Sequence, residues 1–114
     1  MFIVMYNDFD PTQAVHEQNF APKAWGLFPT EEKALKNIKC QGMKIVKRDC
    51  RYYFGSDDYD FQFLIEKKRY VPFGKVVSIT VFEKDSNYAV SRWEFSVIEF
   101  EKISRYGFNQ NNNP

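Results

Sequence analysis

The sequence predicts an α+β fold: a mostly antiparallel sheet of five or six strands with one short α-helix packed on one face, in the order ββαββββ. Three observations predict this class. Apolar and polar residues alternate along several short segments, only one segment combines a helix start with helical spacing, and turn residues separate the segments. The 114 residues fit a single domain, which we expect over 1–105. A polar, asparagine-rich tail follows over 106–114.

Two strands are expected before the helix, over 2–6 and 23–28. The first is a short apolar run that is not long enough to span a bilayer and has no basic flank typical of a secretory signal. Turn chemistry follows it around Asp10-Pro11. Residues 14–20 fit either a short strand or a loop.

The helix is expected to begin after Pro29 and to end at Gly42. Thr30 can cap its first turn, and Glu31 and Glu32 favour the positive end of the helix dipole. A glycine is a common helix stop, so Gly42 marks the predicted end. The apolar stripe of this helix would consist of Ala34, Leu35 and Ile38.

From Met43 onward the apolar period changes to two, which predicts four strands, over 43–54, 59–67, 75–82 and 88–103. In the second of these, one face is shared by Tyr59, Phe61, Phe63 and Ile65. We interpret the stretch FQFLI, residues 61–65, as core. Residues 85–87 have turn chemistry and join the last two strands. The apolar parity of the last strand changes near 97–98, which predicts a bulge there.

Charge is segregated although the net charge is only +1. Residues 33–51 are strongly basic and 67–75 are basic, whereas 1–32 and 52–66 are acidic. Alternating patches suit a protein partner or a local phosphate-binding face better than they suit a uniform polyanion. Aromatic residues make up 18% of the chain, more than one small core normally uses, so we expect some of them on a binding surface.

The sequence predicts no catalytic set, no metal site and no cofactor. His16 is the only histidine and no motif ties it to a nucleophile. Cys40 and Cys50 lack the spacing of a zinc or redox motif; we expect reduced thiols, with a disulfide between them as the alternative. The acidic cluster around Asp57 and Asp58 lacks the spacing of a calcium loop.

A basic patch is the predicted binding site. If 43–54 and 59–67 form a hairpin, the cations that follow the second strand return close to those of the first, with tyrosines beside them. The alternative is a solvated helix face with edge-strand lysines that prevent aggregation. The candidate site residues are Lys44, Lys47, Arg48, Arg51, Tyr53, Lys67, Lys68, Arg69 and Tyr70.

These features favour a small non-catalytic protein-binding module. The chain would be cytoplasmic and would not associate with a membrane. Residue usage is typical of an AT-rich genome, which fits a phage or mobile-element accessory protein that inhibits or modulates a larger host protein. The alternative is a nucleic-acid or nucleotide binder that uses the basic patch, and an enzyme ranks third. A homodimer through an exposed edge strand or an aromatic face stays open.

Overall fold

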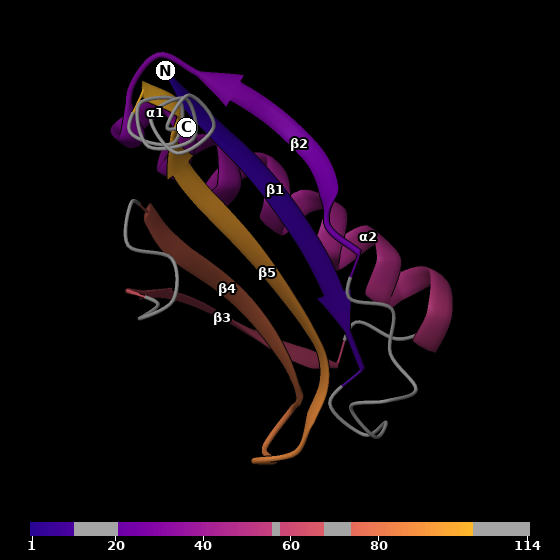
Figure 1. Cartoon of the computed structure of the whole chain (residues 1–114). Coiled ribbons are helices and arrows are strands. Elements are labelled where there is room, and N and C mark those ends of the chain that lie inside the picture. The colour runs from indigo at the N-terminus through magenta and orange to yellow at the C-terminus, as the bar shows by residue number, and fades with distance from the viewer. Residues whose placement is uncertain (11–20, 56–57, 68–73, 102–114) are drawn as a thin grey trace.

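The computed structural model describes residues 1–10, 21–55, 58–67 and 74–101, and it contains one five-stranded antiparallel sheet (Figure 1). The strands are β1 (Phe2–Phe9), β2 (Lys23–Phe28), β3 (Tyr59–Glu66), β4 (Gly74–Glu83) and β5 (Ala89–Glu99). They lie in the order β2-β1-β5-β4-β3, so β2 and β3 form the two edges. The predicted α+β class is confirmed.

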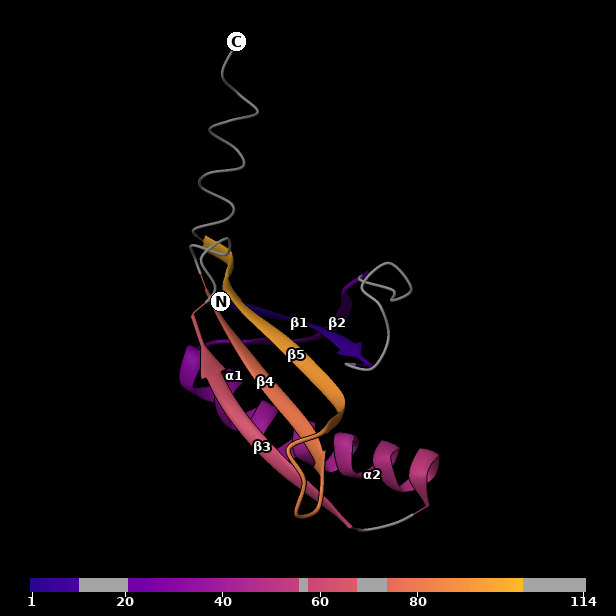
Figure 2. The same cartoon turned by 90° about the horizontal axis from the view of Figure 1, so that it is seen from below.

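A single helical layer covers one face of this sheet (Figure 2). It runs without a break through α1 (Glu31–Asn37), a π-helical segment η2 (Ile38–Gly42) and α2 (Met43–Phe54). The predicted start is confirmed, because Thr30 is extended and its side-chain oxygen accepts from the Lys33 amide at 3.2 Å. The predicted end is wrong, since the helix continues well past Gly42.

The predicted strand over 43–54 is also wrong, because these residues form α2. The alternation of Met43 and Ile45 with lysines extends over too few residues to specify a strand. A longer pattern overrides it, in which the buried helix residues recur at steps of four. They are Ala34, Ile38, Gly42, Val46 and Cys50.

The π-helical segment keeps this stripe facing the sheet. In a helix of 3.6 residues per turn, each step of four rotates the stripe by about 40°, so four steps would rotate it by about 160°. A π turn takes in one more residue before it closes its hydrogen bond, which offsets much of that rotation. The segment lies in the middle of the stripe, so the reduced rotation keeps the buried residues before it and those after it on the sheet side of the helix.

The two glycines of this region have different roles from those predicted. Gly42 is buried in right-handed helical conformation, and an added Cβ would lie 3.3 Å from the Phe95 ring and 3.4 Å from Ile79. Its lack of a side chain therefore lets the helix approach the sheet closely. Gly55 is the actual stop, with φ of +65° and its amide donating to the Arg51 carbonyl.

The core lies between the helix and the inner face of the central strands. Its sheet side is built mainly from valine, isoleucine and aromatic residues of β4 and β5, including fully buried Phe95. Tyr6, Trp25 and Trp93 pack against that ring, and the Trp25 indole N–H donates to the Asn37 amide oxygen at 2.8 Å. This contact ties edge strand β2 to the helix.

The remaining strand predictions have mixed outcomes. The turn at 85–87 is confirmed between β4 and β5, with Asp85 in left-handed conformation. The bulge near 97–98 is wrong, because β5 pairs there without a register shift. The irregularity in this hairpin lies between Val81 and Phe82, opposite Ala89 to Ser91.

None of the helices in the described part of the chain is long and apolar enough to cross a membrane. Several expectations fall on residues outside the described ranges. These are the assignment of 14–20, the environment of His16 and the polar tail over 106–114.

Candidate functional site

A groove of about 530 Å³ lies between α2 and edge strand β3. Four basic side chains line it from the helix, and two aromatic rings line it from the strand. The described lining residues are Lys44, Lys47, Arg48, Cys50, Arg51, Tyr59 and Phe61.

The helix gathers the cations because of their spacing. Lys44, Lys47, Arg48 and Arg51 are related by i, i+3, i+4 and i+7, which places them on one face of a helix. That face borders the buried stripe, so the side chains emerge beside the sheet while staying exposed. On a strand, the same residues would have been divided between two faces.

Two of the helix cations extend over aromatic rings of β3. Lys47 Nζ lies 5.5 Å from the centroid of the Phe61 ring, and Lys39 Nζ lies 6.0 Å from that of Phe63. Both distances fit a cation–π attraction. Since Phe54 also contacts Tyr59, the helix lies along β3 in the antiparallel sense.

The groove is electropositive. None of its described lining residues is acidic, and no carboxylate of the described chain forms an ion pair with Lys44 or Lys47. Arg48 lies 3.6 Å from Asp49, but its side chain is 74% exposed, so the pair contributes little stability. An anion entering the groove would therefore meet Lys44 and Lys47, whose charges no carboxylate of the described chain neutralises through an ion pair.

The two ionisable groups at the base of the groove stay neutral at pH 7. Burial raises the pKa of the Cys50 thiol to about 11, with Asp49 adding to the effect. Burial also raises the pKa of Tyr59, with smaller contributions from Cys50, Glu83 and Asp58. A protonated thiol is a poor nucleophile and a poor metal ligand, so Cys50 acts as an apolar floor.

Both cysteines are free, Cys40 exposed and Cys50 buried, so the disulfide alternative is not realised. Within the described ranges, no group of three or more histidine, cysteine or acidic side chains is arranged to hold a metal ion. The groove thus combines cationic side chains with apolar area among its described lining residues.

The structure brings together four of the predicted site residues and separates others. Lys44, Lys47, Arg48 and Arg51 all line the groove, although a helix and not a strand gathers them. Tyr53 lies elsewhere, beside a small cavity of about 70 Å³ that also contacts β5. Lys68, Arg69 and Tyr70 lie outside the described residues.

Lys67 does not return to the groove as the predicted hairpin required. It follows the last residue of β3, whereas the groove lies at Tyr59 and Phe61 near the start of that strand. Lys67 lies at the end of the sheet that is near the beginning of the helix. At this end, Lys75 Nζ lies 2.5 Å from Glu31. Figure 2 shows β3 ending on the α1 side.

Sequence reasoning missed the aromatic wall of the groove. Phe61 and Phe63 are only half-buried, and Ile65 is 52% exposed, so the stretch interpreted as core lies partly at the surface. The alternation was correctly identified, but alternation cannot distinguish a central strand from an edge strand. Lys39 was also missed as a neighbour of these rings.

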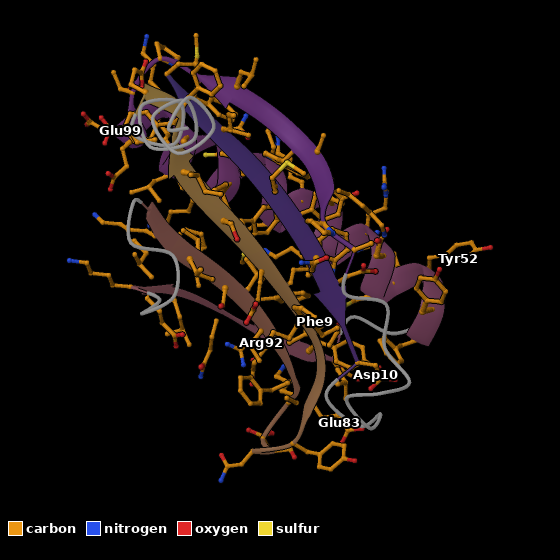
Figure 3. All side chains as sticks on the ribbon, in the orientation of Figure 1. Phe9, Asp10, Tyr52, Glu83, Arg92 and Glu99 are labelled. Atoms are coloured by element: carbon orange, nitrogen blue, oxygen red, sulfur yellow. The ribbon has the colours of Figure 1, made fainter. Side chains whose placement is uncertain are left out.

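Two exposed tyrosines lie in the last turn of α2. Tyr52 is 82% exposed and Tyr53 is 76% exposed, and their rings meet edge to face at 5.2 Å. Figure 3 shows Tyr52 projecting from the last turn of α2 away from the sheet. The prediction that some aromatic residues are exposed is confirmed.

Searches against protein-family models, curated proteins and solved structures found no match to this chain. What the groove can do therefore has to follow from its own residues. Cations along one wall, aromatic rings along the other and an apolar floor together suit an anionic ligand that also carries apolar or planar groups.

Proposed function

We propose that this protein is a small non-catalytic binding module whose basic groove docks an acidic segment of a larger protein. The observation that carries the proposal is the convergence of four cations on one groove with two aromatic rings opposite them. Docking of this kind would let the chain inhibit or modulate its partner, as an accessory protein of a phage or mobile element would.

A protein partner suits this surface better than a polyanion does. The four groove cations belong to α2, and the exposed carboxylates Asp60 and Glu66 lie on the other face of the neighbouring strand β3. A phosphate backbone carries charge on all sides and would be repelled by these acids, whereas a peptide segment can direct its acidic side chains to the groove alone. Aromatic rings next to cations are also typical of protein-binding centres.

Two matched double variants test the proposal. Lys44→Glu/Lys47→Glu reverses the groove, and Lys33→Glu/Lys36→Glu makes the same change of charge at the same spacing elsewhere on the helix. Each protein would be immobilised, exposed to a bacterial lysate and assessed for a partner retained in stoichiometric amount. Circular dichroism would establish that both variants keep their helix.

We expect the wild type and the Lys33/Lys36 variant to retain the same partner, and the Lys44/Lys47 variant to lose it. Retention of that partner by the groove variant at the wild-type level would refute the groove as the docking site. Loss of the partner in both variants would show that net charge, and not the groove, governs the interaction.

The second candidate is a binder of single-stranded nucleic acid, favoured by the exposed pair Tyr52 and Tyr53 beside Arg51. Tyrosine rings can stack on bases while cations contact phosphates. Fluorescence anisotropy with a labelled oligonucleotide would test it at low and moderate salt. Binding that weakens steeply with salt and with Tyr52→Ala would support this candidate, and binding that is absent at low salt would remove it.

A further inference from the structure

We infer that β3 accepts an extended acidic segment of the partner as a sixth strand, with its carboxylates directed toward the cations of α2. This inference deepens the proposed function and rests on it. It specifies how the partner binds: through backbone hydrogen bonds to the free edge of β3 and through alternate acidic side chains in the groove.

The first support is that β3 is an open edge. It is the last strand in the sheet order, and β4 is its only pairing strand among the described elements. It pairs through all eight residues without a register shift. Its sequence, YDFQFLIE, contains no proline or lysine, which are common protections of an exposed edge.

The other edge is less suited to accept a strand. β2 is shorter, with six residues, and its pairing with β1 shifts register between Val4 and Met5. It also contains Gly26 and begins with Lys23, which is paired with Asp8. Irregular register and a charged end are features that disfavour edge-to-edge pairing.

The second support is the orientation of the backbone groups of β3. The Lys84 amide donates to the Asp58 carbonyl, one step beyond the pair of Tyr59 and Glu83. Hydrogen-bonded pairs alternate in an antiparallel ladder, so the even-numbered residues of β3 bond to β4. The residues that direct their amide and carbonyl groups toward the open edge are therefore Tyr59, Phe61, Phe63 and Ile65.

The third support is that these same residues face the helix. Phe61 and Phe63 lie beneath Lys47 and Lys39, so an added strand would lie directly beside the cation-lined groove. Strands pair about 4.8 Å apart, and the alternate side chains of the added strand would point to the α2 side of the sheet. Both the hydrogen-bonding edge and the charged wall thus act on one ligand.

The length of the row of cations matches the spacing of acidic side chains on an added strand. The cations from Lys44 to Arg51 extend along about 10 Å of helix. Carboxylates at positions i and i+2 of a strand are about 7 Å apart, so two or three alternate acids match this length. On the other face β3 presents Asp60 and Glu66, so the intervening residues of the ligand should be neutral or basic.

The test uses a synthetic ten-residue peptide that alternates glutamate with threonine or valine. A control peptide of the same composition carries its glutamates in one block. Two further peptides carry N-methyl groups on the amides of one parity or the other, because such a group removes a donor and blocks strand pairing only where the amide faces β3.

We expect the alternating peptide to bind tightest, and methylation of one parity to abolish binding while the other leaves it within about twofold. In amide hydrogen exchange measured by NMR, the amides of Phe61, Phe63 and Ile65 should become protected by the peptide. The amides of Gln62 and Leu64, already bonded to β4, should change little.

A pair of variants tests the edge from the protein side. Ile65→Pro removes one outward amide without breaking the ladder to β4, and Ile65→Val keeps the amide with a similar side chain. We expect Ile65→Pro to weaken peptide binding about fivefold and Ile65→Val to leave the affinity unchanged. Thermal unfolding would confirm that both variants are folded.

The outcomes separate the two proposals. If the peptide binds, and Lys44→Glu/Lys47→Glu abolishes this binding, but the outward amides of β3 stay unprotected, strand addition is refuted and the acidic docking groove stands. Strand addition is also refuted if both N-methylated peptides lose binding to the same extent. If neither acidic peptide binds the wild type in low salt, the groove as an acidic docking site is refuted as well.

Discussion

Replacing Gly42 by leucine tests the close helix–sheet contact on which the groove depends. Gly42 lies in the middle of the helix, and an added Cβ would lie 3.3 Å from Phe95 Cζ and 3.4 Å from both Ile38 Cγ2 and Ile79 Cδ1. Carbon atoms in good contact are about 3.5–4.0 Å apart. All three neighbours are fully buried, so they have little room to move.

The magnitude follows from two opposing effects. Alanine at position 42 would gain about 1 kcal/mol of helix propensity over glycine, and the tight contacts would remove a similar amount, so Gly42→Ala should be within about 1 kcal/mol of the wild type. Leucine adds further atoms to a site with no space for them. We expect Gly42→Leu to lower the free energy of unfolding by about 3 kcal/mol, with a fall in Tm of roughly 10 °C or more.

Urea denaturation followed by circular dichroism and tryptophan fluorescence measures this change. Gln41→Leu is the matched control, because it places the same side chain on the exposed face one residue earlier, where the cost should stay within about 0.5 kcal/mol. If Gly42→Leu were as stable as Gln41→Leu, the helix would not approach the sheet at Gly42. The helical position of the groove cations would then lose its support.

Three further predictions concern local features. Burial raises the pKa of Cys50 from 9.0 to about 11, so the unfolded chain loses this thiol proton at a lower pH than the folded chain does. The free energy of unfolding should therefore fall as the pH rises from about 9 to about 11. Urea denaturation over this pH range should show a shallower fall for Cys50→Ala. Gly55→Ala should lower the free energy of unfolding by about 1 kcal/mol in the same assay, because a φ of +65° strains a residue with a side chain, while no atom lies within 4 Å of the new Cβ. An unchanged urea midpoint would contradict the left-handed helix end. Thr30→Ala should cost about 1 kcal/mol by removing the cap on the Lys33 amide, and Thr30→Ser should restore most of it; equal losses in both would exclude the hydroxyl as the cause.

The candidate site was partly accessible from sequence. The spacing of Lys44, Lys47, Arg48 and Arg51 is helical, and this signal could have corrected the predicted strand over 43–54. It was outweighed by Gly42, because a glycine after a short helical pattern usually ends a helix. Only the packed structure shows that the missing side chain serves the contact with Phe95.

The aromatic wall of the groove needed the strand order. Alternation placed Phe61 and Phe63 on one face of a strand, and that face does point to the helix. Whether such a strand is central or at an edge depends on pairing with residues distant in the sequence, such as the register of β3 with β4. An edge position leaves these rings half-buried and available to a ligand.

By itself, the sequence determined several local elements: the cap at Thr30, the turn at 85–87, the period-two strands that follow residue 58 and the segregation of charge. These features depend on neighbouring residues, whose spacing and chemistry act over a few positions of the chain. The tertiary structure decided that Gly42 continues the helix, that β3 is an edge and that the cations of α2 face its rings. Those outcomes depend on burial against distant strands, and the free energy of that packing overrides local preference wherever the two disagree.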